Sequence, residues 1–239
     1  MIDAKKVSLS NQVFEKLEEA VLNGYYPQGS IISAEKAASD FRVGTATAKE
    51  ALIRLESERL AETVQSGFKV LGITEKDIND IFNVKRHLET QAAALAAEKM
   101  SQEEINDLTE ILEKQEKAVE EGDSEKVRNL DTKFHDKIYE GCGSTTFELI
   151  LSPVHHKLSK YRKASLDNRE RILNSVKEHR EILEAINSKN SAEAEKTMLK
   201  HIDNSYSSIA KIKDRKQSKG NKNGTYNCAK NYKGSSRQW

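Results

Sequence analysis

The chain has few cysteines and prolines, and it has no long run of apolar residues. Cysteine occurs only as Cys142 and Cys228, too few for a disulfide framework, and proline only as Pro27 and Pro153. Long uninterrupted helices are therefore allowed. No apolar run approaches the roughly 18 residues of a membrane-spanning helix, and the first residues lack the apolar core of a signal peptide. We therefore expect a reduced, cytoplasmic protein with no membrane partner.

Net charge is also nearly absent, although charged residues are abundant. The 239 residues are 32% charged and 36% hydrophobic, with a net charge of +1, and the length fits two domains. From Lys211 onward, however, nine basic residues accompany a single acid, Asp214. We therefore expect residues 214–239 to form a basic, disordered tail. This tail is interpreted either as a solvated extension or as an arm that contacts phosphate.

The first seventy residues alternate between helical periodicity and turn signals. Helices are predicted over 9–23, over 34–41 after the N-cap Ser33, and over 45–60. Two short strands joined at residues 65–67 follow. The order of three helices and a hairpin predicts a winged helix-turn-helix over residues 8–73.

From Thr74 the pattern is helical throughout, and we expect Pro153 to kink or interrupt one of these helices. Ser101 and Glu104 form a capping box at the start of another. The predicted helices are 75–99, 102–121, 124–140, 145–164, 169–188 and 192–212. The expected fold is therefore mainly α, with the winged module followed by an all-helical antiparallel bundle over 74–213 whose core offers a ligand cavity.

Four residues of this bundle have the side chains and spacing of a metal site. Asp131 and His135 are four apart and share one helix face, whereas His179 and His201 come from two further helices. If they converge, one carboxylate and three imidazoles suit a borderline divalent ion and leave positions open for a ligand. Taken alone, however, the Asp131–His135 pair is more typical of a helix surface than of a metal site.

The other three histidines match no motif. His155 and His156 are adjacent, so they point about 100° apart on a helix and are poor joint ligands. We interpret these two and His87 as solvated.

The chain as a whole, over about residues 8–210, resembles the GntR transcriptional regulators, in the FadR-like branch with an all-helical FCD effector domain. In the N-terminal part the matching stretches are LSNQVFEKLEEAVLNGYYPQGS, TAKEALIRLE and QSGFKV. In the C-terminal part they are FNVKRHLETQAAALAA, DTKFHDKIYEGCGS, VKEHREILEAINSKNSAEA and MLKHID. The second set is the more specific, because it combines an Arg-x-x-Glu-x-x-Ala-Ala-x-x-Ala helix with metal-type residues in the order of the family.

The resemblance implies a metabolite-responsive transcription factor, usually a homodimer, with zinc, nickel or manganese in its effector domain. It also implies that Arg86 lies near the effector pocket, where its planar guanidinium suits a small organic acid spanning Arg86 and the metal. The alternative for Arg86 is an ion pair with Glu89 within the same helix. The metal ligands that the resemblance implies are Asp131, His135, His179 and His201.

The DNA-binding half departs from the family pattern. The second helix of a helix-turn-helix enters the major groove with its N-terminus first. Here Lys49 keeps one family charge, but Thr45 replaces an arginine, Glu35 replaces a basic residue, and Arg59 replaces a glycine before the wing. The expected DNA-binding residues are Ser33, Arg42, Thr45, Thr47, Lys49 and Gly67.

The charge of this half agrees with that departure, since residues 1–73 hold nine basic residues and ten acids. Phosphate contact requires local positive charge. The cations that could supply it by clustering on one face are Arg42, Lys49, Arg54, Arg59 and Lys69.

The leading hypothesis is a homodimeric transcriptional repressor that binds double-stranded DNA and is not an enzyme. A metal and a small organic acid would control its DNA binding. A metal-dependent enzyme is the second hypothesis, since open metal sites activate water, but no partner acid or base forms a motif. A third is a metal-binding helical scaffold whose DNA binding has degenerated, which Glu35 and Thr45 favour.

Overall fold

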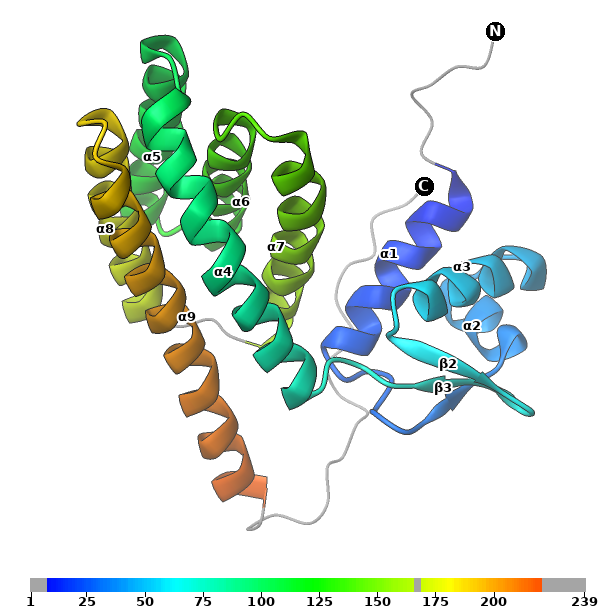
Figure 1. Cartoon of the computed structure of the whole chain (residues 1–239). Coiled ribbons are helices and arrows are strands. Elements are labelled where there is room, and N and C mark those ends of the chain that lie inside the picture. The colour runs from blue at the N-terminus through cyan, green and yellow to red at the C-terminus, as the bar shows by residue number, and fades with distance from the viewer. Residues whose placement is uncertain (1–7, 166–168, 221–239) are drawn as a thin grey trace, which may run out of the picture.

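The structure is a computed structural model that describes residues 8–165 and 169–220 (Figure 1). In it, three helices and a small sheet form the N-terminal module. The antiparallel sheet has the strand order β1-β3-β2, so β3 pairs with both neighbours. Its elements are α1 (Leu9–Leu22), β1 (Ile31–Ile32), α2 (Ala34–Phe41), α3 (Thr45–Ser57), β2 (Ala61–Val64) and β3 (Gly67–Val70). The predicted winged helix-turn-helix is confirmed, with β1 as an added strand that its two-residue length concealed.

Apolar residues at helical spacing hold this module together. Leu17 of α1 packs in one buried cluster with Leu52 and Leu55 of α3 and with Ile32 and Phe68 of the sheet. The side chain of Ser33 accepts a hydrogen bond from the backbone N–H of Lys36, as the predicted N-cap of α2 requires.

Six helices form the C-terminal bundle, in which α4 lies along α9 (Figure 1). Their bounds are α4 (Glu75–Lys99), α5 (Gln102–Glu121), α6 (Ser124–Gly141), α7 (Thr145–Ser165), α8 (Arg169–Asn187) and α9 (Ser191–Gly220). The capping boxes of α4, at Thr74 and Asp77, and of α5, at Ser101 and Glu104, fix where two of them begin.

The structure corrects two details of the helix predictions. Helix α7 continues through Pro153, so the proline does not interrupt it, and Leu151 and Leu158 are buried on either side of the proline. Helix α9 continues to Gly220, beyond the predicted end at 212, because its lysines, arginine and glutamine are good helix formers. Residues 214–220 of the predicted tail are therefore helical, and residues 221–239 lie outside the described part of the chain.

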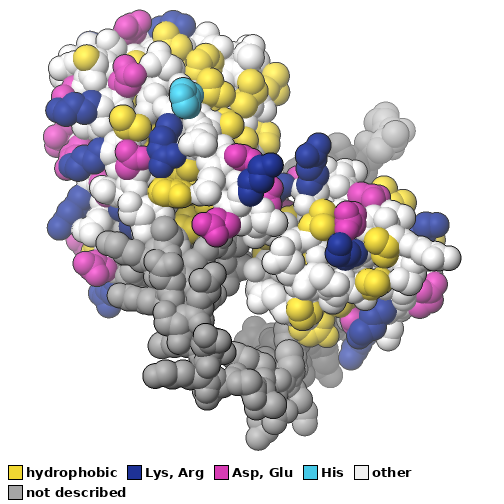
Figure 2. Space-filling model, turned by 60° about the horizontal axis from the view of Figure 1, so that its bottom comes forward, with side chains coloured by type: hydrophobic (Ala, Val, Ile, Leu, Met, Phe, Trp, Pro, Cys, Tyr) yellow, Lys and Arg dark blue, Asp and Glu magenta, His cyan; other side chains and the backbone are white. Residues whose placement is uncertain are grey.

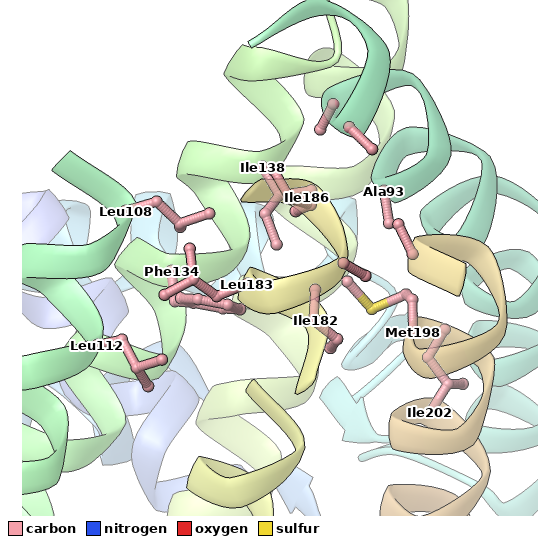
Figure 3. Packing of buried hydrophobic residues seen from close by; sticks show 14 of the residues in the cluster. Ala93, Leu108, Leu112, Phe134, Ile138, Ile182, Leu183, Ile186, Met198 and Ile202 are labelled. Atoms are coloured by element: carbon pink, nitrogen blue, oxygen red, sulfur yellow. The ribbon is translucent and has the colours of Figure 1, made fainter. Parts of the chain in front are cut away.

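Close packing of aliphatic and aromatic side chains forms the core of the bundle (Figure 3). Phe134 and Ile138 of α6 face Leu108 of α5 and Ile182 of α8, and all four are buried. This apolar layer lies directly beside the polar cluster described below, because Phe134 stacks on His179 with ring centroids 4.4 Å apart.

The module and the bundle meet at α7. Helix α1 packs against α7, and the Lys157 ammonium donates a hydrogen bond of 2.6 Å to the backbone carbonyl of Glu58. Glu58 is the C-cap of α3, the second helix of the helix-turn-helix. Helix α7 is thus in direct contact with the end of that helix. Among the described residues, none of the helices is long and apolar enough to span a bilayer.

Candidate metal centre and DNA-binding module

Three buried histidines from three helices meet inside the bundle. His135 of α6, His179 of α8 and His201 of α9 each offer one nitrogen, and these nitrogens all lie within 4.8 Å of one another. All three side chains are nearly inaccessible to solvent. The structure therefore brings together the three imidazoles that the sequence singled out.

Neighbouring groups fix which nitrogen of His179 points to this meeting point. Gln115 donates its amide N–H to the Val127 carbonyl at 3.3 Å, which leaves its Oε1 facing Nδ1 of His179 at 2.9 Å. That oxygen can only accept, so Nδ1 of His179 carries the proton and donates. The lone pair on Nε2 is left for a metal.

His201 is held in the same way by a carboxylate. Glu178 receives both arms of the Arg171 guanidinium at 2.7 and 2.6 Å, and its Oε2 lies 2.8 Å from Nδ1 of His201. Burial alone would raise the pKa of Glu178, but the hydrogen bonds from His201 and Arg171 outweigh it and lower that pKa to about 2. Glu178 is thus the acceptor that orients His201, as carboxylates behind metal-bound histidines do.

The third histidine is oriented from α4. Glu89 is fully buried, and its Oε1 lies 2.5 Å from Nδ1 of His135 and 2.6 Å from the hydroxyl of Tyr139. Each of the three imidazoles therefore has an oxygen of another side chain against Nδ1.

Asp131, one turn before His135 on α6, borders the three histidines without joining their group. Its Oδ1 lies 3.7 Å from Nε2 of His179, and its Oδ2 lies 3.4 Å from Nε2 of His155. The carboxylate is therefore beside the imidazoles, on the side of α7.

These residues fit a divalent ion. Among the described residues, Nε2 of His179 and both ring nitrogens of His135 are buried and form no hydrogen bond, although Nδ1 of His135 lies close to Glu89. A buried polar group without a hydrogen bond costs about 1–3 kcal/mol. Burial is the main cause that lowers the pKa of His201 to about 4 and that of His179 well below its usual value. The imidazoles of His201 and His179 are therefore neutral, the state that a metal binds. A carboxylate and neutral imidazoles suit zinc, nickel or manganese.

The interpretation of His155 as solvated was wrong. His155 and His156 point apart as expected, but the side chain of His155 is only 4% exposed, against 47% for His156. His155 stacks on His135 with ring centroids 4.3 Å apart, whereas His156 pairs with Asp136 at the surface. A fourth histidine therefore belongs to the buried cluster.

Arg86 does not form the ion pair with Glu89 that was the alternative to an effector contact. Its Nε donates to Asp203 at 2.7 Å, and its guanidinium lies over the ring of Tyr206, so that it bridges α4 and α9 near the surface. The cation inside the cluster is its neighbour Lys85, whose Nζ lies 2.5 Å from Oε2 of Glu89. The alternative of an Arg86–Glu89 pair was therefore wrong.

A small cavity adjoins Asp131. Its volume is about 40 Å³. The residues that line it are Gln115, Val127, Arg128, Asp131, Ser159, Ile172 and Ser175. The hydroxyl of Ser175 is buried there, and it has no hydrogen-bond partner among the described residues. Polar and cationic side chains therefore line a space that reaches the candidate metal ligand.

In the winged module, the end of α3 that a helix-turn-helix presents to DNA is accessible. Arg42, in the left-handed turn before α3, and Thr45 and Lys49 of α3 are exposed, and Thr47 is half-buried. Gly67 begins β3 with a φ of +138°, and a β-carbon there would lie 2.6 Å from the Ile32 carbonyl oxygen. Ser33 caps α2. The fold of the module therefore accounts for the glycine at position 67 and the serine at position 33 without a contact with DNA.

Two of the five cations expected on one face have other partners. Arg54 donates to Asn11 and lies 4.2 Å from the centre of the Phe14 ring, facing α1. Lys69 forms an ion pair with Glu62 across β2 and β3 at 2.9 Å. Figure 2 shows basic and acidic side chains interspersed on the visible face of the module rather than one continuous basic patch.

Comparisons with known proteins match both parts of the chain. Residues 9–70 match the model of the gntR family of bacterial regulatory proteins, and residues 80–204 match the FCD domain. The HTH-type transcriptional regulator YdhC of Bacillus subtilis is 28% identical over 194 residues, covering 80% of this chain and 86% of the relative. The gluconate operon transcriptional repressor of Bacillus licheniformis is 28% identical over 152 residues, covering 62% of this chain and 63% of the repressor.

A solved structure has the same fold. Escherichia coli McbR/YncC superposes with a TM-score of 0.66, covering 88% of this chain and 99% of its own at 21% identity. The FCD match spans more than half of the chain and follows a gntR match, in the order of winged module and helical bundle. The chain therefore belongs to the GntR family of transcriptional regulators, in the group with an FCD domain, and is a DNA-binding regulator rather than an enzyme.

Proposed function

We propose that this regulator is a homodimeric repressor whose affinity for DNA is set by a divalent metal and a small organic acid bound in the helical domain. The observation that carries the proposal is the set of three buried imidazoles, each with an oxygen against Nδ1, around one meeting point. In metal sites, an oxygen that accepts a hydrogen bond from the second ring nitrogen of a histidine orients the ring toward the metal. His135, His179 and His201, with Asp131, would hold the metal.

The acid would bind in the cavity beside Asp131. Its volume of about 40 Å³ corresponds to roughly three water-sized positions, so a short carboxylic acid, or the carboxyl end of a longer one, fits. The buried hydroxyl of Ser175 and the Arg128 side chain line it and suit a carboxylate. The metal, when bound, would supply a Lewis-acidic position for the same ligand.

Helix α7 offers a route from this site to DNA. It carries His155 in the buried cluster and, two residues later, Lys157, which holds the C-cap of α3. A change in the position of α7 on binding of the acid would therefore move α3. In a dimer, such movement would change the spacing of the two recognition helices and the fit to a palindromic site.

The role of Arg86 stays a prediction of the sequence, and Arg128, which lines the cavity beside Asp131, is the alternative cation. If the acid spans Arg86 and the metal, Arg86→Ala should abolish binding of the acid and leave the metal content unchanged, because the guanidinium supplies two parallel hydrogen bonds. Isothermal titration of the metal-loaded protein with short carboxylic acids measures this. Unchanged affinity in Arg86→Ala, together with loss in Arg128→Met, would assign the cationic contact to Arg128 instead.

Selection of bound duplexes from a random DNA pool at moderate salt tests the DNA-binding half of the proposal. We expect an enriched palindrome with half-sites about one helical turn apart. Lys49→Ala, at the exposed face of α3, should weaken binding to it, whereas Lys36→Ala, whose cation is already paired with Asp40, serves as a control. Weak, salt-sensitive binding with no enriched sequence would contradict the proposal and favour a scaffold with degenerate DNA binding.

A further inference from the structure

We propose that His155 is a positioning residue of the metal site, which holds one oxygen of Asp131 so that the other oxygen faces the three imidazoles. The inference rests on the proposed metal site and assigns a role to a residue that the metal ligands do not include. It begins from burial, since His155 is the one histidine of α7 that faces inward, into the polar cluster.

Lys85 determines the tautomer of His155. The Lys85 ammonium has hydrogen-bond donors only, and its Nζ lies 3.2 Å from Nδ1 of His155. Nδ1 must therefore accept, which places the ring proton on Nε2. Lys85 is itself held in place, because its Nζ also lies 2.5 Å from Oε2 of Glu89.

The protonated Nε2 of His155 faces Asp131. Its nitrogen lies 3.4 Å from Oδ2, whereas Oδ1 of the same carboxylate lies 3.7 Å from Nε2 of His179. The two oxygens of Asp131 are thus turned toward different partners, a donor on α7 and an imidazole lone pair on α8. Nε2 of His155 is buried and forms no hydrogen bond with another described residue at this separation. The proposal therefore requires His155 to move slightly closer to Oδ2, so that its N–H donates to the carboxylate and fixes its orientation.

Glu89, His135 and His155 also offer ligand atoms within 4.8 Å of one another. In the inferred tautomer, however, Nε2 of His155 carries a proton and Nδ1 faces the Lys85 ammonium, so neither nitrogen offers a free lone pair to a metal. This separates His155 from His135, His179 and His201, whose Nδ1 atoms each face an acceptor oxygen. The cluster therefore holds two kinds of histidine: three that would bind the metal and one that orients the carboxylate.

The test is cobalt binding to the full chain, by isothermal titration and by the visible absorption of bound Co²⁺, which reports coordination geometry. His155→Phe should weaken Co²⁺ binding 10–100-fold, the range found when such outer partners are removed, and should shift the absorption bands. His155→Gln, which keeps an N–H donor, should restore most of the affinity. His156→Phe, at the adjacent exposed position, should match the original protein.

Lys85→Met provides a second test that does not alter the imidazole. It removes the donor that fixes the tautomer, so the cobalt bands should shift while His155 is retained. Because it also leaves buried Glu89, which lies against His135, without its cation, the shift supports the inference only where circular dichroism shows an unchanged fold and His155→Phe shifts the bands as well. Cobalt affinity and bands unchanged in both His155→Phe and Lys85→Met would overturn the inference. So would loss of cobalt in His155→Phe without rescue by His155→Gln, which would make His155 a ligand. Absence of cobalt binding in the original protein would instead overturn the proposed metal site itself.

Discussion

Replacement of Glu89 by alanine is expected to lower the free energy of unfolding by about 3–5 kcal/mol, the usual cost of breaking a buried ion pair. Glu89 is completely buried, 2.5 Å from the Lys85 ammonium and 2.6 Å from the Tyr139 hydroxyl. Burial alone would raise its pKa, but Lys85 and His135 outweigh burial and hold the pKa well below its usual value. The alanine variant therefore leaves a buried, uncompensated lysine.

Urea denaturation followed by circular dichroism measures this effect. The double variant Lys85→Met, Glu89→Leu removes both charges and should regain most of the lost stability, because apolar residues of similar size often replace a buried pair without cost. Glu110→Ala, which breaks the exposed pair with Lys114, is the matched control and should cost under about 1 kcal/mol. A loss in Glu89→Ala no larger than in this control would contradict the account of the buried pair.

Loading the protein with a divalent metal is expected to raise its melting temperature, and His179→Ala should abolish the increase. At a free metal concentration of one hundred times Kd, binding stabilises the folded state by about 2.7 kcal/mol. For a chain of this size, that free energy corresponds to roughly 5–10 °C. His179 is fully buried, and its Nε2 has no partner among the described residues, so its removal deletes a ligand directly.

Differential scanning calorimetry in EDTA and in excess Zn²⁺, Ni²⁺ or Mn²⁺ measures the increase. His156→Ala, an exposed histidine, should respond to metal as the original protein does. Equal melting temperatures with and without every metal tested, or an increase that His179→Ala retains, would contradict the assignment of the three imidazoles.

The helices and their starting points were predictable because the signals are local. The side chains of Thr74 and Ser101 each accept the N–H of the residue three positions later, and the acid at that position accepts the backbone N–H of the N-cap. The sequence predicted this capping box for Ser101 and Glu104 and a helix start after Thr74. The ends were less predictable. The last helix has no glycine or proline before Gly220 to stop it, and its length therefore depends on propensity rather than on a cap.

The three metal-type histidines could be selected from sequence because their order matches a family, but Lys85 and Glu89 could not be selected by that match. A signal was present nevertheless. Ile78, Phe82 and Ala96 lie on the buried stripe of α4 at helical spacing, and Lys85 and Glu89 fall on the same stripe. Arg86 lies one position away and therefore points about 100° aside.

His155 carries the same lesson. It lies between Leu151 and Leu158, at spacings of four and three, so the apolar stripe of α7 places it inside. What sequence could not give is its partner, because Asp131 and Lys85 come from other helices and only packing brings them together.

Control of DNA affinity by the helical domain is the central claim, and fluorescence anisotropy of the selected duplex tests it most directly. The metal-loaded protein is titrated with that duplex, with and without a panel of short carboxylic acids. We expect at least one acid to weaken duplex binding tenfold or more in the original protein and not in His179→Ala, and to bind the protein–DNA complex less tightly by the same factor. Duplex affinity that no acid and no metal changes would contradict the claim.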